Sequence, residues 1–199
     1  NMFTGGLPTE IALLDKLMTL SVNGNRLVSL PTEIGSMQNL RFLSLESNRF
    51  GITLPTEIGQ LNRLVSLSVK NNSFVGPIPS ELGDLRDLRE MLDLSENEFS
   101  GQIPSELGRI NGSLRTLFLR KNLLTGPIPA EMSRLDKVNV LTLDSNNLTG
   151  SMPLDACNVF NRTKPAIFID CDEVFCPCCT YCCQDGEDFE YHYIDTYLE

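Results

Sequence analysis

The stretch LNRLVSLSVKNNSFVGPIP, residues 61–79, contains the pattern that decides how this chain folds. Leu67 and Val69 lie two residues apart, so a β-strand would point both side chains to one face. Leu61 and Leu64 lie three residues apart, which suits a short helical turn leading into that strand. A segment this short cannot bury its apolar face alone, so it needs a copy of itself on either side.

Copies of this pattern follow one another from residue 1 to residue 154, which predicts a solenoid. Each copy ends in a proline, and successive prolines are 23, 24, 24, 25, 25 and 24 residues apart: Pro8, Pro31, Pro55, Pro79, Pro104, Pro129 and Pro153. An asparagine precedes each proline: Asn1, Asn25, Asn48, Asn72, Asn97, Asn122 and Asn146. From Asn25 on, an apolar pair precedes each asparagine: Leu20 and Val22, Leu43 and Leu45, Leu67 and Val69, Leu92 and Leu94, Leu117 and Leu119, Leu141 and Leu143.

The frame between asparagine and proline resembles that of a known family. It reads Asn72-Phe74-Gly76-Ile78-Pro79, Asn97-Phe99-Gly101-Ile103-Pro104 and Asn122-Leu124-Gly126-Ile128-Pro129. This is similar to the plant-type, extracellular leucine-rich repeat of receptor ectodomains and polygalacturonase-inhibitor-like proteins. The resemblance implies an α/β solenoid, a right-handed superhelix with a concave parallel β-sheet and short 3-10 or other helical turns on its convex side. It also implies a ligand face on that sheet.

Two frames depart from the pattern. The frame from Asn25 to Pro31 is one residue short and lacks glycine, and the next frame places Gly51 one position early. We therefore expect the tight turn of these two repeats to be built differently.

The repeated asparagines have a mechanical interpretation. A buried amide offers two donors and an acceptor, which can satisfy backbone groups where each strand leaves the sheet. We expect a structural ladder of Asn25, Asn48, Asn72, Asn97, Asn122 and Asn146.

Charge is distributed unevenly along the 199 residues. The net charge is −10, and residues 170–199 contain nine acids and no lysine or arginine, which leaves the rest at −1. We expect repeats over 1–154 (six complete strands and a partial first repeat), a cysteine-rich cap over 155–183 and an acidic tail over 184–199. Without clustered cations, nucleic acid and anionic membranes are not expected as partners. No apolar run reaches the roughly 18 residues of a membrane-spanning helix.

All cysteines lie in the segment that follows the repeats: Cys157, Cys171, Cys176, Cys178, Cys179, Cys182 and Cys183. A solenoid needs a cap over its last core face, and disulfides commonly hold so short a segment in an oxidising compartment. The segment CDEVFCPCCTYCC resembles the cysteine-rich ends of leucine-rich-repeat proteins from diatoms and related algae. The alternative is a metal site, because Cys179-x-x-Cys182 has the spacing of zinc ligands. Seven is odd, so at least one thiol is free, modified or bonded to another chain.

Further features indicate an extracellular or cell-surface protein of the secretory pathway. Four N-x-S/T sequons occur, at Asn71, Asn111, Asn147 and Asn161, and Asn111 is the best acceptor because it lies in an outer insertion. The chain begins inside a repeat without a signal peptide, so we expect it to be part of a longer protein.

Catalysis is not expected, and neither is a cofactor or a resident metal. His192 is the only histidine and lies in the acidic tail, so it is expected to be an exposed residue. Without it, no Ser-His-Asp or Cys-His arrangement can form.

The sheet positions beside each apolar pair point to the concave side. There we expect exposed ligand-binding residues centred on Phe118 and Arg120: Phe42, Met91, Asp93, Phe118, Arg120, Lys121 and Val140. Aromatic residues beside arginine are common anchors of interfaces.

The sequence favours a non-catalytic recognition module that binds a protein, peptide or glycan. Two alternatives remain open: a structural protein of a cell wall or matrix, joined to a partner through the odd cysteine, and a metal-binding protein that uses the cysteine cluster.

Overall fold

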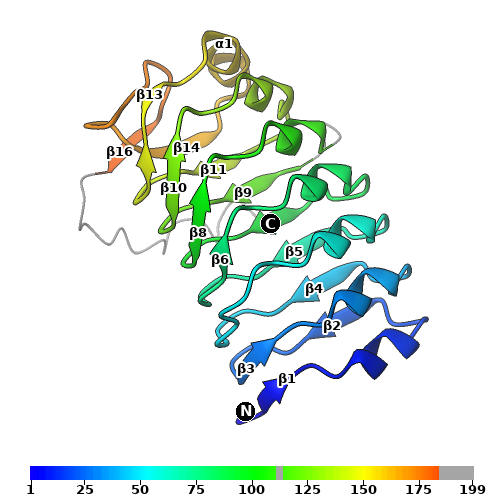
Figure 1. Ribbon diagram of the computed structural model, residues 1–199. Helices are drawn as coiled ribbons and strands as arrows, with labels where there is room; N and C mark the ends of the chain where they lie inside the picture. The colour runs from blue at the N-terminus through cyan, green and yellow to red at the C-terminus, as the bar shows by residue number, and fades with distance from the viewer. Residues whose placement is uncertain (111–113, 184–199) are drawn as a thin grey trace.

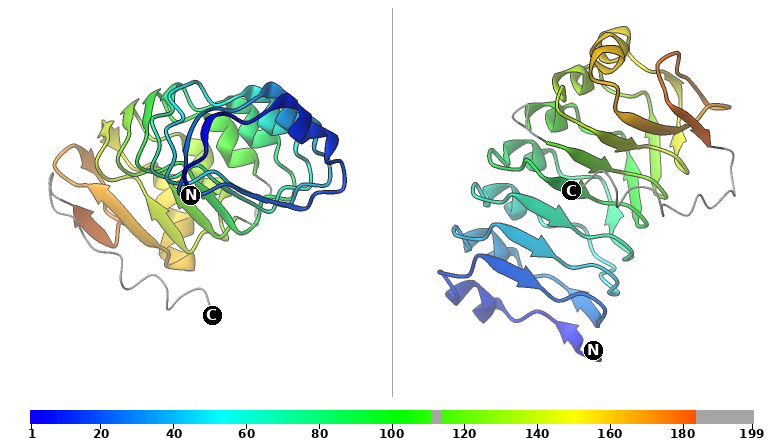
Figure 2. Two further views of the ribbon diagram at one scale, coloured as in Figure 1. Left: turned by 90° about the horizontal axis from the view of Figure 1, so that it is seen from below. Right: turned by 180° about the vertical axis from the view of Figure 1, so that it is seen from behind.

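Each copy of the repeated pattern forms one coil of a solenoid (Figure 1). The computed structural model describes residues 1–110 and 114–183. A coil contains a strand of the concave sheet, a second strand or extended segment beside it, and a short helix that leads into the next coil (Figure 2). The predicted fold is confirmed.

The concave sheet is parallel and has eight strands within the described residues. Along the sheet they are β2 (Thr19–Ser21), β4 (Phe42–Ser44), β5 (Ser66–Ser68), β7 (Met91–Asp93), β9 (Thr116–Phe118), β11 (Val140–Thr142), β14 (Ala166–Asp170) and β16 (Tyr181–Cys183). The first leucine of each apolar pair aligns with that of its neighbour, as Leu67 does with Leu92. The sheet continues for two strands beyond the six expected from the repeats.

A second row of strands runs beside the concave sheet. Its strands are β1 (Thr4–Gly6) and β3 (Arg26–Ser29), then β6 (Val75–Gly76), β8 (Glu98–Gly101), β10 (Leu123–Gly126) and β12 (Asn147–Leu148), and finally β13 (Gly150–Ser151) and β15 (Val174–Phe175). The row is interrupted between β3 and β6, where a single bridge joins Thr53 to Val75. The interruption falls on the second irregular frame, residues 48–55, whereas the first irregular frame contains β3.

In the described part of the chain, six 3-10 helices form the opposite side of the coils: η1 (Thr9–Leu13), η2 (Thr32–Ser36), η3 (Thr56–Gln60), η4 (Ser80–Asp84), η5 (Ser105–Arg109) and η6 (Ala130–Arg134). The repeat proline precedes each one in an extended conformation, and a glutamate lies in the first turn.

Glycine allows the helices of neighbouring coils to approach closely. A Cβ on Gly35 would lie 2.5 Å from the backbone oxygen of Glu57 in the next coil, and Gly59, Gly83 and Gly108 are closer still to theirs. The obstacle is backbone in each case, so a side chain could fit only if the coils moved apart.

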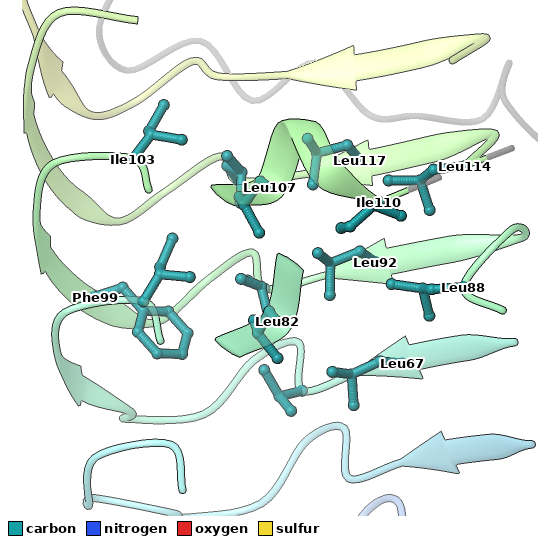
Figure 3. Close-up of a cluster of buried hydrophobic side chains, with 14 of the residues drawn as sticks. Leu67, Leu82, Leu88, Leu92, Phe99, Ile103, Leu107, Ile110, Leu114 and Leu117 are labelled. Carbon is teal, nitrogen blue, oxygen red and sulfur yellow. The ribbon is translucent and has the colours of Figure 1, made fainter. Parts of the chain in front are cut away.

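Columns of apolar side chains fill the interior between these layers (Figure 3). Leu67, Leu92 and Leu117 project inward from neighbouring strands. On the side of the second strands, Phe74 stacks between Phe50 and Phe99, with ring centroids 5.4 Å and 5.9 Å away.

The asparagine side chains form a column of hydrogen bonds between coils. The Asn97 Nδ2 donates to the carbonyl oxygens of Leu94 (3.2 Å) and Ser95 (3.0 Å) in its own coil and of Val69 (3.0 Å) in the preceding one. Its Oδ1 accepts from the backbone N–H of Phe74 at 3.0 Å. Equivalent bonds are made by Asn48, Asn72, Asn122 and Asn146. Asn25 makes the bonds within its own coil, and its Oδ1 accepts from the backbone N–H of Phe3 in the preceding coil.

The last coil is covered by a segment of different design. Helix α1 (Leu154–Thr163) replaces the 3-10 helix and packs against η6. A disulfide joins Cys157 of this helix to Cys178, and a second joins Cys176 to Cys179. Cys171 is also disulfide-bonded. Within the described residues, no helix is long and apolar enough to cross a bilayer.

The asparagine column predicts a specific loss of stability. Asn97→Ala removes the amide and leaves the buried N–H of Phe74 without its acceptor, at a cost of about 1–3 kcal/mol. We expect a lower midpoint of urea unfolding. Asn62→Ala, which removes an exposed amide on the outer side, should change the midpoint little; equal effects would contradict the assignment.

The close contacts between helices predict that adding a single methyl group to one of these glycines lowers the stability of the folded protein. Gly83→Ala places a Cβ against the backbone of Glu106, and such overpacking typically costs about 1–3 kcal/mol. Gly51→Ala is the matched control, because its nearest obstacle lies 4.0 Å away. Thermal unfolding of both variants is the measurement, and an unchanged Gly83→Ala protein would show that the coils can separate at little cost.

Candidate ligand-binding surface

The concave surface is assembled from residues that alternate with the buried leucines. Leu43 and Leu45 point into the core, so Phe42, Ser44 and Glu46 point outward from the same strand. Parallel pairing without register shifts places corresponding residues of successive strands side by side. The surface is therefore a set of columns, and its chemistry changes from one end of the sheet to the other.

The first strands present small and exposed residues. Thr19 and Ser21 of β2 are exposed, and Ser44 and Ser66 are partly exposed. Phe42 interrupts this polar region; it is half-buried, and the guanidinium of Arg41 lies 5.9 Å from its ring centroid. The structure thus leaves Phe42 apart from the other predicted binding residues.

An apolar cluster lies on the later strands. Phe118 and Ala166 pack against Val140 and Phe168, which come from the neighbouring strands β11 and β14. The ring of Phe168 stacks on Tyr181 of β16, with centroids 4.5 Å apart. The structure brings Phe118 and Val140 together as predicted, but Val140 is only 5% exposed, so it supports the cluster from below.

A pocket of about 360 Å³ adjoins this apolar cluster. Val140, Ala166 and Tyr181 form its apolar wall, and Lys164 and Thr180 add polar groups. Thr180 is held in place because its Oγ1 donates to the carbonyl oxygen of Pro165 at 2.9 Å. The volume is at the lower end of the range for small-ligand sites, about 300–1,000 Å³.

The predicted cationic pair divides into a buried and a more accessible member. Arg120 is only 7% exposed and its Nε lies 3.3 Å from the Oδ2 of Asp144, so the expectation of an exposed Arg120 is wrong. The burial arises because neighbouring strands place other side chains around it. Lys121 is partly exposed at the next position, where the backbone has a φ of 51° as the strand turns away.

Asp93 also differs from the exposed residue predicted from sequence. It is 6% exposed, and its Oδ1 accepts hydrogen bonds from the backbone N–H and the hydroxyl of Ser95. Burial raises the pKa of the Asp93 carboxyl above its ordinary value, and Glu46 adds to the rise. The Ser95 hydrogen bonds and the charge of Lys70 lower this pKa and offset only part of the increase. Met91, two residues before Asp93, is half-buried on the same face.

Sequence reasoning missed the contribution of the cap to this surface. Phe168, Asp170 and Tyr181 lie on strands that extend the concave sheet past the last predicted repeat. The signal was present, since Ile167 and Ile169 form one more apolar pair two residues apart. This pair differs from the earlier ones because Asp172 occupies the position at which each of them is followed by an asparagine.

The predicted glycosylation sites differ in their relation to this face. Asn71 is exposed three residues after β5 ends, and its Nδ2 donates to the Ser47 hydroxyl at 3.1 Å, so a glycan there would border the concave surface. Asn147 and Asn161 are exposed on β12 and α1. Asn111 lies outside the described residues, as do His192 and the acidic tail.

A larger cavity of about 620 Å³ lies away from the concave surface. Leu30, Ile52 and Pro77 contribute to its lining, where the second row of strands is interrupted. The opening lies beside the frame from Asn48 to Pro55, which forms no second-row strand and contributes only the Thr53–Val75 bridge.

Comparison with known families agrees with this geometry. A family model described as a leucine-rich repeat region matches residues 2–98, and a leucine-rich-repeat model matches residues 90–110 and 113–135. Together they match well over half of the chain. The chain belongs to the leucine-rich-repeat family. No curated protein of similar sequence was found.

Solved structures similar to this leucine-rich-repeat chain include plant receptor ectodomains. A TDR receptor is 32% identical, with a TM-score of 0.78 over 88% of this chain and 29% of its own. The Arabidopsis receptor kinase HAESA, solved with the peptide hormone IDA and the co-receptor SERK1, is 30% identical with a TM-score of 0.75, over 88% of this chain and 29% of its own. A plant ice-binding protein is 26% identical with a TM-score of 0.66, over 89% and 59%. The chain therefore spans less than a third of each receptor.

The raised pKa of Asp93 predicts a pH-dependent stability. Between the ordinary aspartate pKa of about 3.9 and its higher folded value, the folded protein holds a proton that the unfolded chain has lost. Asp93 therefore contributes stability at low pH that disappears as the pH rises through its folded pKa. Asp93→Asn cannot ionise, so the stability of this variant relative to wild type should increase from acid toward neutral pH.

Urea unfolding of wild type and Asp93→Asn across this pH range measures the effect. Asp84→Asn, which changes an exposed carboxylate on η4, is the control and should show a much smaller trend. A difference between Asp93→Asn and wild type that does not vary with pH would contradict the raised pKa.

Proposed function

We propose that this chain is the ligand-binding part of an extracellular or cell-surface recognition protein, and that it binds a peptide across the later strands of its concave sheet. The observation that carries this proposal is the apolar cluster around Phe118, which adjoins a pocket and buried charged groups on one face. Interfaces commonly combine an apolar centre with a polar rim.

The shape of this surface favours a peptide that lies across several strands. Successive strands are about 4.8 Å apart, so the faces of β9, β11 and β14 together span about three residues of an extended chain. An apolar side chain of the ligand would contact Phe118 and Phe168, and a neighbouring one would enter the pocket beside Tyr181.

The charges of the surface favour a ligand with a defined polarity. Lys121 and Lys164 are basic residues near the apolar cluster, whereas Asp144 and Asp170 are acidic residues buried beside it. Charged groups of both signs on a binding surface determine the register of a bound chain more than they raise its affinity. Arg120 and Asp144 would act chiefly as a rigid support, because a buried ion pair that loses one partner leaves a costly charge.

The relatives support the same class of ligand. HAESA was solved with a peptide hormone, and RGFR1, a further similar structure at 26% identity with a TM-score of 0.55, was solved with the peptide RGF2. The disulfides of the cap are consistent with an oxidising, extracellular location.

A peptide-display selection against the folded chain tests the proposal, followed by calorimetric affinity measurements with the selected peptides. Phe118→Ala should weaken binding by roughly tenfold or more, since the loss of an aromatic anchor commonly costs about 2 kcal/mol. Lys121→Ala should weaken binding less and should reduce its salt dependence.

Leu123→Ala is the matched control for the apolar substitution. Leu123 is 57% exposed on β10, outside the concave sheet, so its removal should leave affinity unchanged. Arg63→Ala plays the same role for charge, on the helix side of the coil. If Phe118→Ala binds normally and either control loses affinity, the ligand site lies on another face.

A further inference from the structure

The two described disulfides of the cap lie against each other. One links α1 to the following loop through Cys157 and Cys178, and the other closes the loop between Cys176 and Cys179. The Sγ atoms of Cys176 and Cys178 belong to different disulfides and are 3.9 Å apart. The Sγ atoms of Cys157, Cys176 and Cys178 all lie within 4.8 Å of one another.

This separation matches the ligand spacing of a tetrahedral metal site. Zinc–thiolate bonds are about 2.3 Å long, so two sulfurs on one tetrahedral ion lie about 3.8 Å apart. The Sγ atoms of Cys176 and Cys178 already lie at that spacing. Cys157 and Cys179 are each bonded to one of these two sulfurs, so reduction would leave four sulfurs close together that need to move apart only slightly to surround one ion. A soft set of thiolates selects ions such as Zn²⁺ or Cd²⁺ over Mg²⁺ or Ca²⁺.

We propose that the reduced cap is a binding site for one soft divalent ion, with Cys157, Cys176 and Cys178 as ligands and Cys179 as the fourth. This site is separate from the peptide surface and does not depend on the proposed recognition function. The cap would then have two alternative closures, one made by two disulfides and one made by a metal ion.

The conversion balances in electrons and protons. Two molecules of a dithiol reductant supply four electrons and four protons to the two disulfides, and each reductant molecule becomes a disulfide. The four cysteines are then thiols, and the bound divalent ion displaces their four protons as the thiolates form. Affinity should therefore increase with pH.

The backbone holds the ligands near one another without the sulfur bonds. Cys157 is buried in α1, which packs against η6. Before the loop, β15 pairs with β13, and Phe175 accepts a hydrogen bond from the N–H of Met152 at 2.9 Å. After the loop, β16 pairs with β14. These contacts limit how far the thiols can separate on reduction.

The site differs from the one that sequence spacing suggests. The Cys179-x-x-Cys182 spacing would use a cysteine of β16, whereas the structure groups Cys179 with Cys176 and places Cys157 beside them. The two choices can be distinguished by substitution.

Cadmium titration of the full reduced chain, after anaerobic removal of the dithiol, is the test. We expect one Cd²⁺ per chain, an ultraviolet thiolate-to-cadmium absorption band, and protection of four thiols from alkylation. Cys157→Ser and Cys176→Ser should each weaken Cd²⁺ binding by roughly tenfold or more. Cys171→Ser and Cys182→Ser should retain the affinity of the unmodified chain.

Circular dichroism of each variant checks that the repeats remain folded, and Cys176→Ser provides a test in the loop if Cys157→Ser disturbs α1. Absence of stoichiometric Cd²⁺ binding would overturn the proposal. Binding that survives both Cys157→Ser and Cys176→Ser, or that is lost in Cys182→Ser alone, would also overturn it.

Discussion

The turn at the end of each concave strand leaves backbone groups that no strand can satisfy, and the asparagine column satisfies them. Asn97 binds three carbonyl groups and one N–H, and two of these four partners belong to the preceding coil. An unpaired buried polar group is costly, so each coil depends on its neighbour for a complete set of hydrogen bonds. The same dependence appears on the helix side, where Gly59 and Gly83 allow backbone to approach backbone. The stacking of coils therefore depends on specific hydrogen bonds and close backbone contacts as well as on the burial of apolar side chains.

Because the coils stack regularly, the residue at each outward position of a repeat determines the chemistry of one part of the concave surface. Because the register does not shift along the concave sheet, a residue at one position in a repeat always lies beside its equivalents. Small hydroxyl residues then form a polar region on the early strands, and Phe118, Val140 and Phe168 form an apolar cluster on the later ones. The core remains the same while the outward positions vary, which is how a repeat scaffold acquires a local binding surface.

The cap does more than cover the last coil. Its strand β14 continues the register of the repeats, with Ile167 beside Leu141, and so adds Phe168 to the concave face. Its helix α1 takes the place of a 3-10 helix and presents Cys157 to the loop that follows β15. The segment that closes the core thus also completes the concave surface, and two disulfides hold α1 and the loop after β15 together.

The sequence by itself determined the solenoid, its period, the buried leucine pairs and the position of the asparagine column. These follow from local periodicity, because every repeat meets the same neighbours. Tertiary structure alone decided the exposure of Asp93 and Arg120, because burial of an outward side chain depends on its neighbours across the sheet. It also decided which cysteines meet and that the cap extends the sheet. Those features depend on contacts between residues outside the repeat period, for which a single sequence contains no internal copy to compare.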